Sequence, residues 1–116
     1  MTLFMLESLM IGDDLFYSPL ALDNDLADIV AMFVDELPDR VEALREALRS
    51  GDRELLGRAA HQLKGSAGSY GFPQITPFAA RLEYGARANE PEATLLQMLN
   101  ELAAVCSKAQ AGKPVR

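Results

Sequence analysis

Apolar side chains recur every three or four positions through most of the chain, the spacing of helices that bury one face. The first long periodic segment begins near Asp23 to Asp25, whose side chains can cap free amide groups, and it ends at Ser50 and Gly51. Its apolar positions are Leu26, Ile29, Val30, Phe33, Val34, Leu37, Val41, Leu44 and Leu48. Because Pro38 interrupts it, the pattern predicts either one helix kinked at the proline or two nearly collinear helices.

Two shorter periodic segments follow. The first is expected to begin with Asp52 as its N-cap and to run to about Tyr70, with Gly71 as its stop. The second is expected to take Thr76 as its cap and Pro77 as its first helical residue.

A last periodic segment starts at residues 89–91 and carries Leu95, Leu96, Met98, Leu99, Leu102 and Val105. Beyond Ala109 the tail is expected to fray. No segment shows the alternation of a half-buried strand. Four amphipathic helices with short connections predict an all-α fold, an antiparallel four-helix bundle.

The N-terminal stretch MTLFMLESLMI is apolar but contains Glu7, and no basic residue precedes it. It is too short to span a bilayer and lacks the charged start of a signal peptide, so we expect no membrane partner. Leu3, Leu6, Leu9 and Met10 recur at helical spacing, which predicts an additional short N-terminal helix packed on the body of the domain.

The length of 116 residues suits a single domain, covering residues 1–116. Within it we expect the N-terminal helix and an extended connector at residues 1–22, the helical bundle at 23–109 and a frayed tail at 110–116. The default oligomeric state is a monomer.

The charge and the cysteine content restrict the partners and the cellular location that we expect. The net charge is −6 and no basic run is present, which argues against a nucleic-acid partner. The lone Cys106 makes neither an internal disulfide nor a thiolate metal site, and it fits a reducing, cytoplasmic location. We expect it to be a small buried apolar side chain on the last helix.

The only histidine, His61, falls on the side of its helix opposite to the apolar stripe. The apolar stripe consists of Leu56, Ala59, Ala60, Leu63, Ala67 and Tyr70. Around His61 the wheel places Gly57, Lys64, Gly65 and Gly68, with Arg58 at the margin. Each glycine inside a helix costs about 1 kcal/mol relative to alanine. The bare surface would let another molecule reach the ring edge; the alternative is close packing of a second helix on the glycines.

The stretch AAHQLKGSAGSYGF, residues 59–72, resembles the signature of histidine-containing phosphotransfer (HPt) domains. It is also similar to the phosphoacceptor domain of chemotaxis histidine kinases. The residues on matching positions are His61, Lys64, Gly65, Ser66, Gly68 and Gly71. Weaker resemblance extends over roughly residues 23–89, and it aligns Glu83 with the family's Gln or Glu that hydrogen-bonds the histidine.

The resemblance implies a phosphorelay intermediate. His61 would accept the phosphoryl group, Lys64 would stabilise its charge and Glu83 would orient the ring. The implied partners are response-regulator receiver domains and a sensor or hybrid histidine kinase. No cofactor would be bound, and Mg²⁺ would come from the partner's site. The expected docking surface consists of Gly57, Arg58, Gln62, Gly65 and Gly68.

Other functions remain to be weighed. An HPt-like bundle could bind a receiver or kinase without carrying phosphate, as a pure interaction module. A di-iron bundle is disfavoured because Arg58, not Glu, stands three residues before His61. No glycine-rich phosphate loop follows a strand, which argues against kinase activity of the chain itself. Met32 and Phe33 could form an apolar rim beside the site, although core packing is the better interpretation of Phe33.

Overall fold

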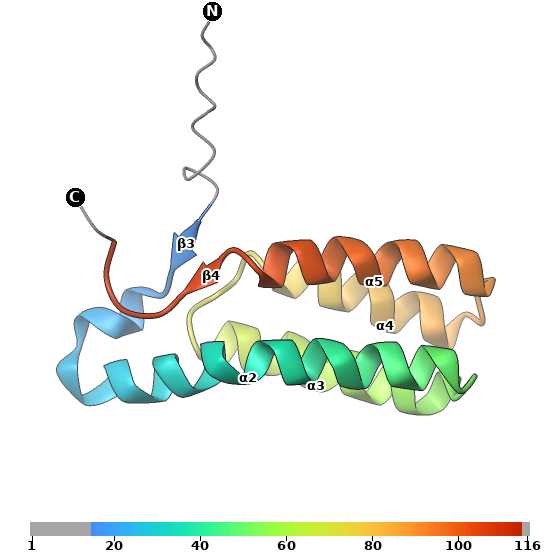
Figure 1. The fold of residues 1–116 in the computed structure, drawn as a ribbon, viewed down its shortest axis with the longest axis horizontal. Helices are drawn as coiled ribbons and strands as arrows, with labels where there is room; N and C mark the ends of the chain where they lie inside the picture. Colours follow the sequence, from blue (N-terminus) through green and yellow to red (C-terminus); the bar gives the residue numbers. More distant parts are fainter. Residues whose placement is uncertain (1–14, 115–116) are drawn as a thin grey trace, which may run out of the picture.

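The computed structural model describes residues 15–114, and four helices in this range form an antiparallel bundle (Figure 1). They are α2 (Asn24–Arg49), α3 (Arg53–Ser69), α4 (Thr76–Arg87) and α5 (Glu92–Cys106). In the view of Figure 1, α2 and α5 lie in front of α3 and α4. The predicted all-α four-helix bundle is confirmed, while the additional N-terminal helix falls outside the described residues.

Pro38 does not divide the first segment, since α2 is one helix of 26 residues. The choice left open by the sequence is therefore settled in favour of one helix. Its start agrees with the prediction, because the side chain of Asp23 accepts a hydrogen bond from the amide of Asp25 at 2.8 Å. Capping in this way satisfies one of the free amides of the first turn.

The helix that carries His61 begins and ends as predicted. Asp52 accepts a hydrogen bond from the amide of Leu55 at 3.0 Å and so caps α3. Gly71 follows the end of the helix with φ +85°, a left-handed conformation that suits glycine. A Cβ at this position would also collide with the hydroxyl of Ser18, so two features of the fold require glycine here.

The starts of the last two helices correct the prediction. Thr76 is the first residue of α4 rather than its cap, and its buried hydroxyl has no hydrogen-bond partner. Ile75 occupies the cap position instead, because the turn from Phe72 already leads into the helix. The last helix, α5, starts at Glu92, one residue after the predicted start at 89–91, because Pro91 has an extended ψ of 152° and occupies the cap position.

Aromatic rings close one end of the core. Phe33 of α2 is buried, and its ring stacks on Tyr70 at 5.0 Å and on Phe72 at 5.8 Å between centroids. Core packing of Phe33 is therefore confirmed. Met32, by contrast, is 60% exposed. The rest of the core consists mainly of Leu, Ile, Val and Ala side chains, most of them from the four helices, and it includes Cys106, whose burial agrees with the prediction.

The two ends of the described chain meet in a two-stranded parallel sheet. Strand β3 (Phe16–Tyr17) pairs with β4 (Ala109–Gln110), and a 3-10 helix, η2 (Pro19–Leu22), leads from β3 towards α2. The connector therefore contains a paired strand that its composition did not predict. Gln110, which we placed in a frayed tail, pairs with Tyr17, and the neighbouring Ala109 is buried. No helix within residues 15–114 is both long enough and apolar enough to cross a membrane.

Candidate functional site

His61 stands on the outward side of α3, with 60% of its side chain exposed. Leu56, Ala60, Leu63 and Ala67 of the same helix are buried on the other side, as their spacing predicted. The helix therefore holds the imidazole at the surface while its own apolar stripe anchors it to the core. The ring edge is open to a second molecule.

The imidazole is held by a residue 22 positions away. Nδ1 of His61 lies 3.0 Å from Oε2 of Glu83, which α4 presents to α3. A carboxylate only accepts hydrogen bonds, so Nδ1 must carry the proton in this contact. In the neutral ring the lone pair then resides on Nε2.

Glu83 is the centre of a small charge network. Its side chain is only 13% exposed. Lys64 Nζ lies 2.9 Å from Oε1, and Arg87 Nε lies 3.1 Å from the same Oε2 that contacts His61. The hydrogen bond from Lys64, and after it that from His61, lower the pKa of Glu83 despite the opposing effect of burial. The network therefore keeps the carboxylate ionised as an acceptor for the ring.

One of the predicted site residues is placed differently from our expectation. Lys64 is not that residue, since it contacts the carboxylate that also holds the imidazole. Gly57 is buried between α3 and α4, where a Cβ would lie 3.5 Å from Cγ of Arg87 and 3.8 Å from Cβ of Ala86. Its prediction as part of the docking surface is wrong, because α4 packs over that turn of α3.

The remaining glycines of the face are bare, as predicted. Gly65 and Gly68 are exposed. A Cβ at Gly65 would meet nothing within 4 Å, and one at Gly68 would meet only the Thr76 hydroxyl at 3.9 Å. No packing inside the described chain requires glycine at these two positions. The alternative of close helix packing therefore fails for Gly65 and Gly68.

An open depression of about 500 Å³ lies beside the imidazole. It is lined by Arg40, His61, Gln62, Gly65, Ser66, Ser69 and Tyr70. Gln62 and Gly65 thus lie where the docking surface was expected. Arg58 is exposed outside this depression and pairs with Glu54 at 3.3 Å.

Sequence reasoning missed two cationic residues of this region. Arg87 follows Glu83 by one helical turn, a spacing that could have identified it once Glu83 was chosen. Arg40 comes from α2 and lines the depression. No local signal identifies Arg40, because its position depends on how α2 and α3 pack. Within residues 15–114, no group of three His, Cys, Asp or Glu side chains is placed to hold a metal ion.

Comparison with known families agrees with this geometry. The model of the Hpt domain family matches residues 28–108, a range that includes His61, Lys64 and Glu83. Searches of curated proteins and of solved structures gave no match. The family match indicates a role in histidine phosphotransfer signalling, in which such domains interact with response regulators and kinases. The chain therefore belongs to the Hpt domain family.

Proposed function

We propose that the protein is a phosphorelay intermediate that carries a phosphoryl group on His61 between signalling proteins. The observation that carries this proposal is the 3.0 Å contact between His61 Nδ1 and Glu83 on an otherwise exposed ring. An idle surface histidine needs no carboxylate from a second helix. A histidine that must present Nε2 to a partner does, because the contact fixes both the tautomer and the ring plane.

The proposed reaction is a direct displacement at phosphorus. The Nε2 lone pair attacks the phosphoryl group of a receiver aspartyl phosphate, and a P–N bond forms while the P–O bond to the aspartate breaks. The aspartate carboxylate leaves with the electron pair, and the Nδ1 proton stays in its hydrogen bond to Glu83. In-line geometry is required, so the partner must approach along the open edge of the ring.

Charge stabilisation is divided between the two proteins. Lys64 and Arg87 are the cations that contact Glu83 at the site, and Lys64 lies one helical turn from His61 on the same helix. After transfer, either cation could exchange its carboxylate contact for a phosphoryl oxygen. Mg²⁺ would be supplied by the acidic pocket of the partner, and the domain itself would bind no cofactor.

The partners follow from the same chemistry. We infer that the protein binds receiver domains and a sensor or hybrid histidine kinase. We also infer that it does so as a monomer in the cytoplasm. The docking surface we propose consists of Arg58, Gln62, Gly65 and Gly68, around His61. Gly65 and Gly68 leave room for the partner to settle over the ring.

Phosphoryl transfer from isolated receiver domains tests the proposal. Receivers charged with acetyl phosphate are mixed with the protein, and the expected product is an acid-labile, base-stable phosphate on His61. His61→Gln should abolish uptake while leaving the melting temperature almost unchanged, because an exposed side chain contributes little to stability. Binding to receivers without any uptake would instead support the pure interaction module, and no uptake from any cognate receiver would overturn the relay.

A further inference from the structure

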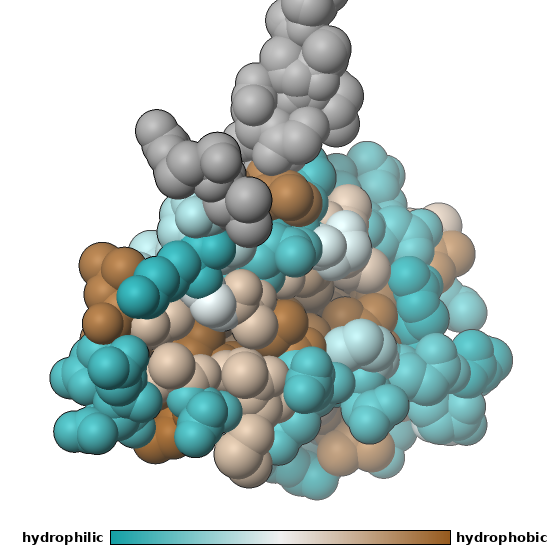
Figure 2. Space-filling view, turned by 60° about the vertical axis from the view of Figure 1, so that its left-hand side comes forward, coloured by the Kyte–Doolittle hydropathy of each residue, from teal (hydrophilic) through white to brown (hydrophobic). Residues whose placement is uncertain are grey.

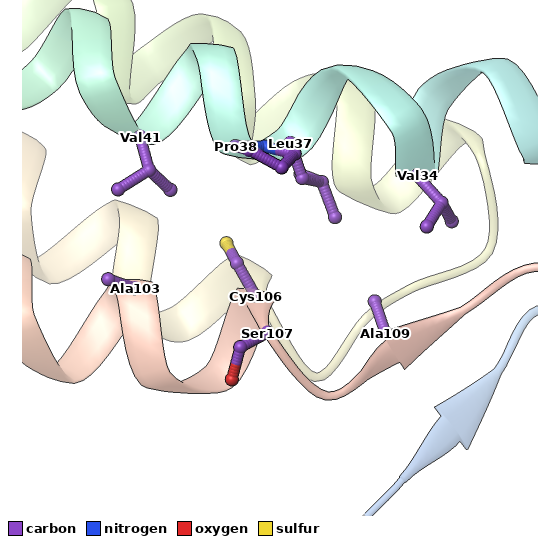
Figure 3. A pocket seen from close by; sticks show the side chains of 8 residues that line it. All are labelled: Val34, Leu37, Pro38, Val41, Ala103, Cys106, Ser107 and Ala109. Carbon is purple, nitrogen blue, oxygen red and sulfur yellow. The ribbon is translucent and has the colours of Figure 1, made fainter.

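An apolar groove runs between α2 and α5 on a part of the molecule away from His61. It has a volume of about 380 Å³. It is lined by Val34, Leu37, Pro38, Val41, Ala103, Cys106, Ser107 and Ala109. In Figure 3 the sulfur of Cys106 is directed at α2, whereas the hydroxyl of Ser107 points away from it. None of these residues lines the depression beside the imidazole.

The lining of the groove offers a partner mainly apolar surface. On the face drawn in Figure 2, apolar residues gather in the centre, and others lie at the edges among hydrophilic residues. Within the groove itself, Ser107 is the only polar residue of the lining described. A ligand with charges to satisfy would find little to bind there, whereas leucine and methionine side chains would gain from burial.

The sequence supplies such a segment next to the groove. Fourteen residues precede Leu15, and β3 begins immediately afterwards at Phe16. Phe16 is paired with Ala109, which itself lines the groove. The chain therefore enters the described fold at the groove's own wall. A tether of four residues, 11–14, spans up to about 13 Å when extended.

The dimensions of segment and groove agree. Leu3, Leu6 and Met10 fall on one side of a helix, and a helix from Leu3 to Met10 would be about 10.5 Å long between its end residues. Val34 and Val41, the outermost groove residues on α2, are also seven residues apart on a helix and so about 10.5 Å apart along it. The apolar stripe from Leu3 to Met10 would therefore match the length of the groove along α2.

We propose that residues 3–10 dock as an amphipathic helix in the groove between α2 and α5. Leu3, Leu6 and Met10 would face Val34 and Val41 on its wall and the largely buried Leu37 and Cys106 on its floor. The segment of the same chain is favoured over a second copy, because a connection of only four residues keeps the segment near the groove at a high effective concentration. This surface is separate from the phosphotransfer site, so the proposal does not rest on the function of His61.

Cys106 permits a direct test, since it is the only cysteine of the chain and lies in the groove. We would introduce a cysteine at position 6 (Leu6→Cys) or, as a matched control, at position 4 (Phe4→Cys). Positions 4 and 6 lie about 160° apart around a helix, so only one of them can face the groove. Both are at nearly the same distance along the chain from Leu15, which makes position 4 a matched control. A disulfide needs the two Cα atoms within about 7 Å. Burial raises the pKa of the Cys106 thiol to about 12, which slows both variants alike.

In dilute oxidised protein, L6C should form an intramolecular disulfide at least tenfold faster than F4C. Equal rates would overturn the docked orientation, and a disulfide formed only between two molecules would overturn docking within one chain. If neither variant is oxidised, methyl NMR of the full chain decides. Leu6→Asp should shift the resonances of Val34 and Val41 while Phe4→Asp leaves them unchanged, and unchanged resonances in both would reject the proposal.

Discussion

The carboxylate of Glu83 lies 3.0 Å from Nδ1 of His61 and shares the same oxygen with Arg87, while Lys64 holds the other oxygen at 2.9 Å. This largely buried carboxylate of α4 thus contacts two nitrogens of α3, from His61 and Lys64, and one of α4 itself, from Arg87. In the proposed relay, Glu83 would orient the phosphoryl acceptor without itself contacting the phosphoryl group. Its proposed role is that of a positioning residue.

Replacing Glu83 should slow phosphoryl uptake without preventing docking. A hydrogen bond to a charged group contributes about 1.5–3 kcal/mol. If all of it is needed in the transition state, Glu83→Ala should slow transfer roughly 10- to 100-fold. Glu83→Gln retains an acceptor oxygen and should lose less. The transfer rate is measured by quenching the reaction with a phosphorylated receiver at successive times. An unchanged rate for Glu83→Ala would show that transfer does not need Glu83 to orient the ring.

The same carboxylate should make stability depend on pH. Because hydrogen bonds from Lys64 and then His61 lower its pKa below the usual value of 4.5, Glu83 stabilises the fold above that value. This contribution is lost as the pH falls through the lowered pKa of the folded state. In urea unfolding, the difference in free energy between the wild type and Glu83→Gln should therefore be largest near neutral pH and shrink below pH 4.5.

A control for this titration is Glu54→Gln, which removes an exposed carboxylate from the start of α3. Exposed ion pairs contribute about 0–1 kcal/mol. The free energy of unfolding of Glu54→Gln should therefore differ little from that of the wild type at every pH. A pH-independent difference for Glu83→Gln would contradict the linkage.

The glycines of α3 and α4 should respond in opposite ways to alanine. Gly65→Ala should raise the free energy of unfolding by about 0.5–1 kcal/mol, because its Cβ meets nothing within 4 Å. Gly85→Ala should give no such gain, since its Cβ would lie 2.9 Å from Sδ of Met98 and 3.1 Å from Cδ2 of Leu95, which must move. Equal gains at the two positions, measured by urea unfolding, would refute the distinction.

Gly68→Leu should weaken receiver docking while leaving the fold intact. The added side chain would stand on the exposed face two turns from His61, and its Cβ meets only the Thr76 hydroxyl at 3.9 Å. Calorimetric titration with an unphosphorylated receiver would give the affinity. The matched control is Gly57→Ala, whose new methyl group would be buried against Arg87 and Ala86 rather than presented to a partner. Unchanged affinity of Gly68→Leu would mean that clearance over the ring is not needed.

Much of this arrangement could be predicted from the sequence because it follows from local rules. The cap at Asp52, the stop at Gly71 and the exposure of His61 each depend on a few neighbouring residues. Contacts between helices could not be predicted in this way. The burial of Gly57 depends on how closely α4 packs on α3, and helical spacing carries no information about that distance.

The other differences have the same origin. Thr76 has the residue type of a cap and stands before a proline, yet the turn from Phe72 starts the helix one residue earlier. The pairing of Phe16 with Ala109 joins residues from opposite ends of the chain, and a two-residue strand is too short to show an alternating pattern. Glu83 was identified by resemblance to the family, and only the structure brings Arg87 to it.

The parallel pairing of β3 with β4 has a consequence for tethering. Both ends of the described chain emerge beside each other (Figure 1), and β4 contacts α2 rather than the helix that carries His61. The two ends of the described chain therefore share one attachment region at the β3–β4 pair, and neither of these two strands belongs to the helix that carries His61.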